Sequence, residues 1–326
     1  MAPPAESTDR GHFDGRRFFN PTGAQGQPFR KIPQLLLTKR TQWPDYVPVT
    51  PRRPPPPEGP GDAVVTFVGH ATLLIQTSAG NVLTDPVYAE RASPLRFAGP
   101  RRVRPPGVAF DDLPAISLVV VSHNHYDHCD LRTLAALDRR SGPLFVTPLG
   151  NGPLLKSAGI RRVEELDWWQ DAAVTAPRVT LTPAQHFSSR GPFDRNRALW
   201  GGFVISAGSR RIFFAGDTGY APHFREIRQR FGPVDLALLP IGAYEPRWFM
   251  KDVHVDPAEA VQAHLDLEAR QSIGMHFGTF QLTPEGIDDP VVALGEALRA
   301  RQVPNGRFRT LDFGESMRLA PAPAMS

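Results

Sequence analysis

The segment from Val119 to His128 constrains the chain most. An apolar run that predicts a buried strand passes here directly into three imidazoles and a carboxylate, in the pattern His-x-His-x-Asp-His over residues 123–128. Imidazole and carboxylate are ligands of zinc, iron or manganese, and the lack of thiolates argues against a cysteine-rich structural zinc site. His123 and His125 can point one way from a turning loop while Asp127 and His128 point another. The spacing therefore predicts a site for two metal ions rather than a histidine-rich surface loop.

Short apolar runs on both sides of this motif predict alternating strands and helices. Asp130 and Asp256 stand before two of the predicted helices and are candidate N-caps, with Pro257 at the first helical position of the second. We expect helices at 131–137, 257–269 and 292–299, and continued alternation through 144–146, 154–157 and 163–166. We expect strands at 63–68, 73–77, 82–85, 116–121, 179–182, 202–208, 211–217, 234–240 and 309–313.

The second half of the chain is similar to the first. Segments 202–208 and 211–217 parallel residues 72–85, and an aspartate, Asp85 or Asp217, ends the equivalent strand of each half. Segment 234–240 corresponds in the same way to 116–122; chance similarity between apolar hairpins is the alternative explanation. Two copies of a mixed sheet with helices outside predict an α/β fold, with two mixed β-sheets packed face to face and the site between their edges.

Length and composition are compatible with one sizeable core. The 326 residues are 41% hydrophobic, which is enough to bury a substantial core. Residues 1–60 are rich in proline and arginine and predict an N-terminal extension, followed by a folded domain over residues 61–320. The single cysteine, Cys129, excludes an intramolecular disulfide and is compatible with a reducing compartment. The motif beside Cys129 is complete without it, so we expect no direct role for this thiol.

The net charge of +4 is a weak signal for an anionic partner. Most basic residues are arginines, which together with 35 prolines indicates a codon bias, and we expect no nucleic-acid partner. Residues 29–43 combine leucines with basic residues and predict a short segment that touches lipid or docks onto the core. No stretch has the apolar length of a signal peptide or a membrane span. We therefore expect a cytoplasmic protein, with attachment to the inner membrane surface left open.

The histidine motif resembles the signature of the metallo-β-lactamase superfamily. Members also have a distant histidine, a metal-bridging aspartate at a strand end and a last histidine near the C-terminus. Candidates are His186 after strand 179–182, Asp217 after 212–216, and His276 after 272–275. The resemblance implies an αββα sandwich. It also implies one ion held by His123, His125 and His186, another held by Asp127, His128 and His276, and Asp217 bridging the two.

Further segments resemble the N-acylphosphatidylethanolamine-hydrolysing phospholipase D family over residues 63–318. These segments are 69–72, 83–86, 91–94, 122–128, 166–169, 213–220, 241–250 and 276–280. The resemblance implies two zinc ions, with iron or manganese as alternatives, and a metal-bridging hydroxide that attacks phosphorus to give phosphatidic acid and an N-acylethanolamine. It also implies a phospholipid substrate, a peripheral membrane contact and a homodimer. Residues before 60 do not match the animal enzymes, and Val253 replaces a polar residue, so lipid specificity stays open.

Individual roles follow from this resemblance and from residue chemistry. Asp127 or Asp217 would handle the proton, and His254 would stabilise the transition state or protonate the leaving group. A carboxylate that accepts the outer N–H of a ligand imidazole fixes its tautomer, which makes Asp85 a candidate for orienting the ligands, with turn-making as the alternative. His70 is a second candidate for this supporting role.

The stretch 241–251 is the distinctive part of the second half. Trp248, Phe249 and Met250 stand in a row, which fits neither a strand nor a helix with one wet face. We expect these side chains to line an apolar pocket beside the active site, with plugging of the core as the alternative. Together with Tyr126 and Tyr244, they are the candidate substrate-binding residues.

Other functions are compatible with the same ligand set. A lactonase or β-lactamase-like hydrolase would use the metals against a carbonyl carbon. Iron dioxygenases and diiron oxygen reductases share the implied scaffold, and RNA processing is a further alternative. A binding protein that is stabilised by metal is the non-enzymatic alternative.

Overall fold

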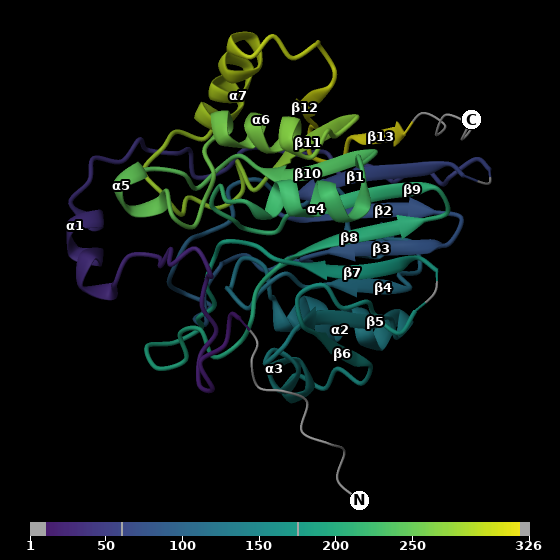
Figure 1. The fold of residues 1–326 in the computed structure, drawn as a ribbon, viewed down its shortest axis with the longest axis horizontal. Coiled ribbons are helices and arrows are strands. Elements are labelled where there is room, and N and C mark those ends of the chain that lie inside the picture. The colour runs from purple at the N-terminus through teal and green to yellow at the C-terminus, as the bar shows by residue number, and fades with distance from the viewer. Residues whose placement is uncertain (1–10, 60, 175, 320–326) are drawn as a thin grey trace, which may run out of the picture.

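The computed structural model describes residues 11–59, 61–174 and 176–319, and shows two β-sheets packed face to face with helices outside (Figure 1). The first sheet has the order β13-β1-β2-β3-β4-β5-β6, with bounds Ser316–Leu319, Ala63–Gly69, Thr72–Thr77, Gly80–Thr84, Leu118–Val120, Leu144–Pro148 and Val163–Leu166. The second has the order β12-β11-β10-β9-β8-β7, with bounds Phe308–Thr310, Gln271–Met275, Leu236–Pro240, Arg210–Phe214, Gly202–Ala207 and Arg178–Thr182.

Both halves of the chain have the same pattern of strand pairing. In the first half, β1, β2 and β3 are antiparallel neighbours, and β4, β5 and β6 add in parallel. In the second half, β7, β8 and β9 are antiparallel, and β10, β11 and β12 add in parallel. The predicted internal similarity and the predicted pair of mixed sheets are therefore confirmed.

The predicted closing strand at 309–313 is wrong in its extent. β12 ends at Thr310, and a further strand, β13, crosses to the first sheet and pairs antiparallel with β1. Gly314 lies in the turn between them with φ of 83°, a region of backbone conformation that favours glycine. A Cβ there would approach Gly107 O at 2.3 Å, so the turn also requires the missing side chain.

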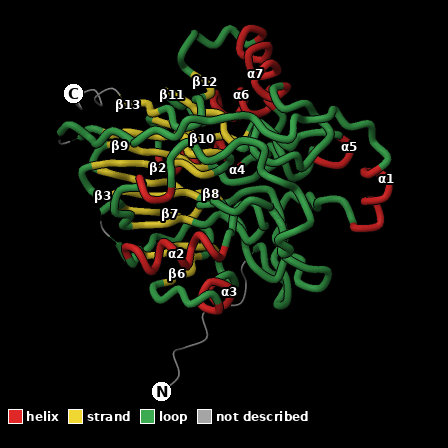
Figure 2. The backbone as a smooth tube through the Cα atoms, turned by 180° about the vertical axis from the view of Figure 1, so that it is seen from behind, coloured by secondary structure: helices red, strands yellow, loops and turns green. Residues whose placement is uncertain are grey.

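Helices cover the outer faces of both sheets (Figures 1 and 2). Asp130 caps α2 by accepting from Arg132 N, and Asp256 forms a capping box with Glu259 at the start of α6, as the sequence predicts. α6 ends earlier than predicted because Glu268 adopts a positive φ of 46°. The helices are α1 (Ile32–Leu36), α2 (Leu131–Ser141), α3 (Gly152–Ser157), α4 (His223–Phe231), α5 (Arg247–Met250), α6 (Pro257–Asp266) and α7 (Asp289–Ala300).

Alternating side chains of the first sheet build two separate cores. Leu73 and Ile75 of β2 face the second sheet, where they belong to the same buried cluster as Phe203 and Phe214. Leu74, which lies between them in the sequence, joins the cluster under α2 instead. This period of two explains why the strands are apolar throughout, since both faces of the sheet are covered.

The N-terminal segment contacts the domain at several points along its length. His12 Nε2 lies 2.8 Å from Asp167 Oδ1, Asn20 Nδ2 donates to the carbonyl of His186 at 2.9 Å, and Trp43 Nε1 donates to Glu285 O at 2.8 Å. Residues 29–36, predicted to touch lipid or to dock, form a short 3-10 turn and α1. The division of the chain at residue 60 stays a prediction. Within the described residues, none of the helices combines the length and the hydropathy that crossing a bilayer requires.

Candidate metal centre

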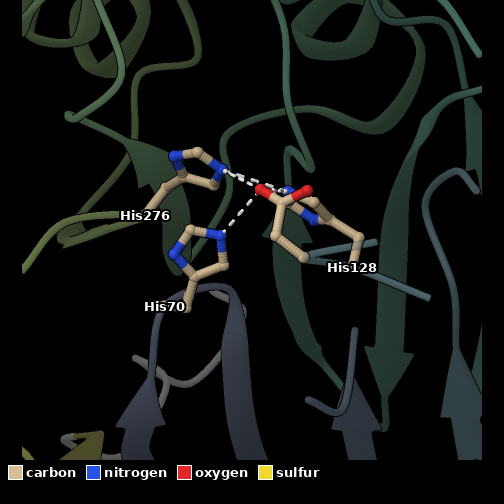
Figure 3. A group of neighbouring side chains, drawn as sticks. His70, His128 and His276 are labelled. Atoms are coloured by element: carbon tan, nitrogen blue, oxygen red, sulfur yellow. Dashed lines mark hydrogen bonds and ion pairs between the residues drawn. The ribbon is translucent and has the colours of Figure 1, made fainter. Parts of the chain in front are cut away.

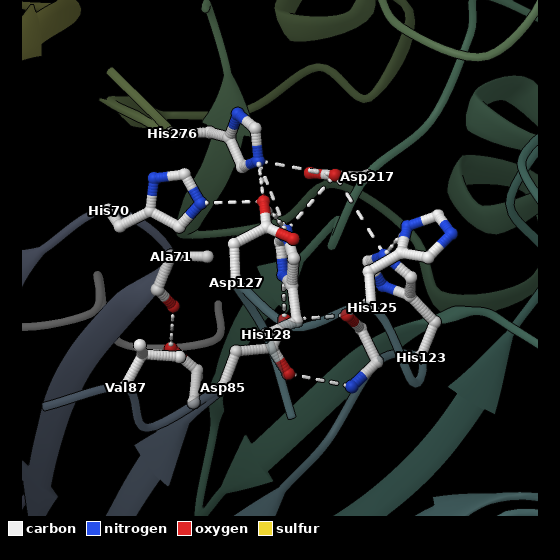
Figure 4. A network of polar contacts seen from close by, with 12 residues as sticks. His70, Ala71, Asp85, Val87, His123, His125, Asp127, His128, Asp217 and His276 are labelled. Atoms are coloured by element: carbon white, nitrogen blue, oxygen red, sulfur yellow. Dashed lines mark hydrogen bonds and ion pairs between the residues drawn. The ribbon is translucent and has the colours of Figure 1, made fainter. Parts of the chain in front are cut away.

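The carboxyl ends of strands from both sheets deliver the site, as is general for α/β sheets (Figure 4). The chain positions that follow these strands are His70 after β1, Asp85 after β3, residues 123–128 after β4, His186 after β7, Asp217 after β9 and His276 after β11. His70, Asp85 and His276 have positive φ values of 57°, 32° and 62°. Such conformations persist only where the surrounding contacts fix them. The backbone is thus held in a strained form at three strand ends of one site.

A first group consists of His123, His125 and His186. His123 Nε2 lies 2.8 Å from His125 Nδ1, and His186 Nε2 lies 3.3 Å from the same atom. His123 and His186 are buried, and the three ligand-type nitrogens lie within 4.8 Å of one another. The structure therefore brings together the three residues that the sequence predicts for one ion.

A second group consists of Asp127, His128 and His276, joined by His70 (Figure 3). Asp127 Oδ2 lies 3.4 Å from His128 Nε2, 3.4 Å from His276 Nε2 and 3.0 Å from His70 Nε2. The nitrogens of His128 and His276 lie 3.1 Å apart. The predicted residues for the other ion converge, and His70 contacts them directly rather than from a distance.

Asp217 lies between the two groups (Figure 4). Its Oδ2 is 3.0 Å from His128 Nε2 and 3.2 Å from His276 Nε2, and 3.9 Å from His123 Nε2 in the first group. Gly216, with φ of 60°, allows this approach, because a Cβ there would meet Ser122 Cβ at 2.7 Å. Asp217 thus lies close to both groups, which is where the resemblance expects a shared ligand.

The donor set fits two divalent cations. Three imidazole nitrogens converge in the first group, and carboxylate oxygens face imidazoles in the second. Asp217 Oδ1 is buried and has no hydrogen-bond partner within the described residues. A buried carboxylate oxygen without a partner costs free energy that a cation would recover. Two ions could therefore bind here, one to the three histidines of the first group and one to Asp127, His128 and His276, with Asp217 shared.

Asp85 holds the motif from behind. Its Oδ1 accepts from Ser122 N at 2.7 Å, and its Oδ2 accepts from Ser122 Oγ at 2.5 Å and from His128 Nδ1 at 2.7 Å. Ser122 Oγ in turn lies 2.9 Å from His123 Nδ1. Because a carboxylate can only accept, one buried aspartate directs the Nε2 lone pairs of His128 and, through Ser122, of His123 into the site.

Burial and mutual charge set the protonation of the site. Burial, together with the facing imidazole of His128, lowers the pKa of His123 well below its usual value. Burial alone would raise the pKa of Asp217, but His128 and His276 hold it well below the usual range. Burial opposes charge on His276, yet Asp217 and Asp127 raise the pKa of that ring to about 9. The carboxylates therefore attract positive charge to the second group.

His254 also reaches the site, as predicted. Its Nε2 lies 4.0 Å from Asp217 Oδ2, and its ring centroid lies 5.1 Å from that of His186. Arg247 holds the backbone here, because its Nη1 donates to His254 O at 2.9 Å while its Nη2 donates to Glu259 Oε2 at 2.7 Å. The structure thus brings all three predicted catalytic residues, Asp127, Asp217 and His254, to one place.

The predicted substrate-binding residues are more dispersed. Trp248, Phe249 and Met250 lie in α5, a helix of only four residues. Four residues make about one turn and need no sustained apolar stripe. Met250 is buried, whereas Trp248 is 42% exposed. Burial thus differs along this row, and its role in substrate binding stays a prediction.

A cavity of about 740 Å³ lies beside the metal loop. Tyr126 lines it, but Tyr244 and the three residues of α5 do not. Its wall combines apolar groups with arginines, namely Pro94, Leu95, Phe110, Leu131, Ala136, Arg91, Arg96, Arg132 and Arg190. Its volume is within the range typical of sites for small organic ligands.

Sequence reasoning missed Arg190, which joins this cavity to the motif. Its Nη1 donates to Asn124 O at 2.8 Å and to Cys129 O at 2.9 Å, and its guanidinium lies 3.9 Å from the centroid of the Tyr126 ring. Nothing local to residue 190 indicates this, because its partners lie about 60 positions earlier in the chain. Cys129 itself is buried, and burial raises the pKa of its thiol to about 12, as suits an unreactive group.

Comparison with solved structures agrees with this architecture. The metallo hydrolase Igni18 from Ignicoccus hospitalis superposes with a TM-score of 0.59 at 21% identity, covering 79% of this chain and 99% of that chain. An isothiocyanate hydrolase from Delia radicum gut bacteria superposes with a TM-score of 0.62 at 20% identity, covering 78% and 98%. At these identities the likeness concerns the fold.

Sequence comparison identifies the family. Residues 80–277 match the family described as the beta-lactamase superfamily domain. N-acyl-phosphatidylethanolamine-hydrolyzing phospholipase D 1 of Caenorhabditis elegans is 41% identical over 77% of this chain and 74% of its own length. N-acyl-phosphatidylethanolamine-hydrolyzing phospholipase D, mitochondrial, of Saccharomyces cerevisiae is 35% identical over 69% of this chain and 49% of its own length. The chain is therefore a metal-dependent hydrolase of the β-lactamase superfamily and belongs, within it, to the family of N-acylphosphatidylethanolamine-hydrolysing phospholipases D.

Proposed function

We propose that the protein is a two-zinc phosphodiesterase of phospholipase D type, which hydrolyses N-acylphosphatidylethanolamine-like phospholipids to phosphatidic acid and an N-acylethanolamine. The observation that carries the proposal is the position of Asp217, whose Oδ2 lies within 4.0 Å of His nitrogens in both groups. A carboxylate shared in this way suits a pair of ions that acts on the attacking and leaving oxygens of a displacement at phosphorus.

In this proposal His123, His125 and His186 would hold one ion, Asp127, His128 and His276 would hold the other, and Asp217 would be shared between them. When bound, two zinc ions would supply a water of lowered pKa and would neutralise the charge that builds on the phosphoryl oxygens. Neutral imidazoles and ionised carboxylates are the forms that bind metals, and burial already favours the neutral form of His123. Iron or manganese suits the same donors, so elemental analysis of the purified protein tests the choice of zinc.

The chain's own residues would orient the substrate and move the proton. Burial lowers the pKa of His254 well below its usual value, so the ring is neutral and has one N–H to donate. We assign this N–H to a phosphoryl oxygen, where charge grows in the transition state, or to the departing oxygen. Asp127 or Asp217 is the candidate acceptor for the proton of the attacking water, and this proton would pass on to the departing oxygen, which leaves as the hydroxyl of the N-acylethanolamine.

The cavity beside Tyr126 is our candidate for the site of the lipid. Its apolar side chains, including Leu95, Phe110 and Leu131, suit an acyl chain, and its arginines suit phosphate oxygens. Tyr126 would connect it to the metal loop, since this residue stands between His125 and Asp127. The roles of Tyr244, Trp248, Phe249 and Met250 in substrate binding stay predictions.

Contact with a membrane surface would let the protein reach such a lipid. α1 and α5 lie beside one another at one side of the molecule (Figures 1 and 2). The backbone carbonyl of Trp248 accepts from Gln27 Nε2 at 3.3 Å, and Leu37 is 86% exposed. We infer a peripheral contact at this side, tested by sedimentation with anionic vesicles of the wild type and of Leu37→Asp. A homodimer stays a prediction for analytical ultracentrifugation.

The test of the proposed reaction is hydrolysis of vesicles containing N-acylphosphatidylethanolamine in ¹⁸O-labelled water, with lipid mass spectrometry. Attack on phosphorus places the label in phosphatidic acid. A label in a released fatty acid instead would indicate a carbonyl-directed hydrolase, and turnover of a lactone panel without turnover of bis(p-nitrophenyl) phosphate would do the same. Asp217→Asn should abolish the phosphatidic acid signal, while Cys129→Ala, a buried change outside the ligand set, should keep it.

A further inference from the structure

The two halves of the chain place equivalent residues at equivalent strand ends. His186 and Asp217 follow the first and third strands of the second half, and both face the metal groups. His70 and Asp85 follow the first and third strands of the first half. Asp85 supports His128 from behind, which raises the question of what His70 does in the same half.

His70 touches two residues of the second group at once. Its Nε2 lies 3.0 Å from Asp127 Oδ2, and its backbone carbonyl accepts from His276 N at 2.9 Å. Its ring centroid lies 4.0 Å from that of His276, and the edge of its ring meets Phe280 at a centroid distance of 5.3 Å. His70 is 2% exposed, so these contacts fix the ring without competition from solvent.

His70 could bind an ion itself, or it could hold Asp127. The proposed second ion takes its nitrogens from His128 and His276, which leaves His70 outside the ligand set. Because a carboxylate has no proton to give, we therefore assign the hydrogen of the 3.0 Å contact with Asp127 Oδ2 to His70 Nε2. That nitrogen then has no lone pair for a cation. His70 Nδ1 carries the lone pair instead, and it is buried with no hydrogen-bond partner within the described residues.

We propose that His70 is a positioning residue of the second metal group, which donates its Nε2–H to Asp127 Oδ2 and fixes the backbone of His276 through its carbonyl. Asp127 keeps its other lone pairs for the ion, while the hydrogen bond sets the direction of the carboxylate. The first half thus supplies two supports, Asp85 for His128 and His70 for Asp127, and the second half supplies ligands from the same two positions. The inference rests on the proposed two-ion site and adds a residue to which that proposal gives no role.

The test measures ion affinity, not turnover. Chelator competition and stoichiometry are recorded for the wild type, His70→Ala and His70→Gln, since the Gln amide can donate a hydrogen bond in place of the imidazole N–H. We expect two ions in the wild type, and in His70→Ala a roughly 10–100-fold weaker binding of one ion with the other unchanged. His70→Gln should recover most of this affinity. With Co²⁺ as the probe, the visible bands of one ion alone should change in His70→Ala.

A buried histidine outside the site provides the matched control. His264, whose Nδ1 lies 2.7 Å from Ser272 Oγ, is replaced by Ala and Gln, and both ions should bind as in the wild type. If His70→Ala does not fold, His70→Leu, which fills the space without a donor, replaces it.

Two results would overturn the inference. Unchanged affinity in His70→Ala would show that Asp127 needs no support, and equal loss in His70→Gln and His70→Ala would show that the imidazole itself binds the ion. A wild-type protein that binds fewer than two ions would count against the proposed function instead.

Discussion

The replacement Asp85→Asn should disturb both metal groups, although the proposed site includes Asp85 in neither ligand set. The carboxylate accepts three hydrogen bonds, from Ser122 N, Ser122 Oγ and His128 Nδ1, and is fully buried. Asparagine has nearly the same size, so the change leaves packing intact. Its carbonyl can keep the bond from Ser122 N, but its NH₂ group must then face the two donors that shared Oδ2.

The consequence is a reversal of tautomers. His128 would have to accept at Nδ1 and carry its hydrogen on Nε2, which faces the ions. The Ser122 hydroxyl would accept from the amide and donate to His123 Nδ1, from which it lies 2.9 Å, so His123 would also carry its hydrogen on Nε2. In the proposed site His123 belongs to the first group and His128 to the second. One atom exchange thus places a hydrogen in front of each ion.

The size of the effect follows from these contacts. Loss of support to a ligand histidine costs about 10–100-fold in metal affinity, and here each ion loses one support. In the wild type Ser122 Oγ and His128 Nδ1 donate to the charged Oδ2 of Asp85. Each such hydrogen bond contributes roughly 1.5–3 kcal/mol to folding stability, and both are disturbed in Asp85→Asn. Metal-free Asp85→Asn should therefore also unfold at a clearly lower urea concentration.

Competition with a coloured chelator measures both ion affinities, and urea unfolding of the metal-free protein measures stability. Asp138→Asn is the control, because Asp138 is also buried and accepts from Arg161 Nε at 2.8 Å, but lies outside the site. It should lose stability and keep both ions. Wild-type affinity for both ions in Asp85→Asn would refute the tautomer argument, and weakening of the His128 ion alone would refute the relay through Ser122.

Three further outcomes follow from the structure. Arg247→Lys removes the two-pronged guanidinium contact that joins His254 O to Glu259. Displacing a catalytic group lowers the rate more than the binding, so kcat should fall roughly tenfold with KM little changed. Steady-state kinetics on N-acylphosphatidylethanolamine vesicles measure both constants, and a rise of KM alone would contradict this. Burial lowers the pKa of His223 to about 3, so its folded form resists the proton that the unfolded chain accepts near 6.5. The stability from neutral His223 is present above pH 6.5 and is lost as the pH falls toward 3, at about 1.4 kcal/mol per pH unit, and urea titrations of His223→Gln should show a shallower acid slope than those of the wild type. Removal of metal by a chelator should lower Tm, because the converging carboxylates and imidazoles lose the cations between them. Addition of Zn²⁺ should restore Tm. An unchanged Tm would mean that the site is stable without ions.

The sequence predicted much of the fold because its signals are local. Apolar runs with a period of two, the caps Asp130 and Asp256, and the parallel between the two halves depend on neighbouring residues. The register of each sheet then follows, since a slip by one residue would expose the buried face of a strand. Boundaries failed where backbone conformation decided them, at Gly314 and Glu268.

Residue chemistry indicated the candidate ligands of the loop 123–128, since histidine and aspartate so close together have few other uses. His186, Asp217 and His276 were candidates only through the family resemblance, and they follow strands that end at the same site. The contacts that orient these ligands were less visible. Arg190 donates to a backbone carbonyl of the motif and Arg247 donates to the carbonyl of His254, and these groups come together only after the sheets pack.

The sequence by itself determined which atoms can bind metal and that two similar halves would supply them, because ligand type and strand pattern are properties of short segments. Only the tertiary structure decided which residues of each half face the metal groups and which support them. Asp85 and Asp217 end equivalent strands, yet Asp85 is bonded to His128 Nδ1 and Asp217 lies between the two groups, since their environments differ once the two sheets pack together. The contact of His70 with Asp127, across 57 positions of the chain, has the same physical origin.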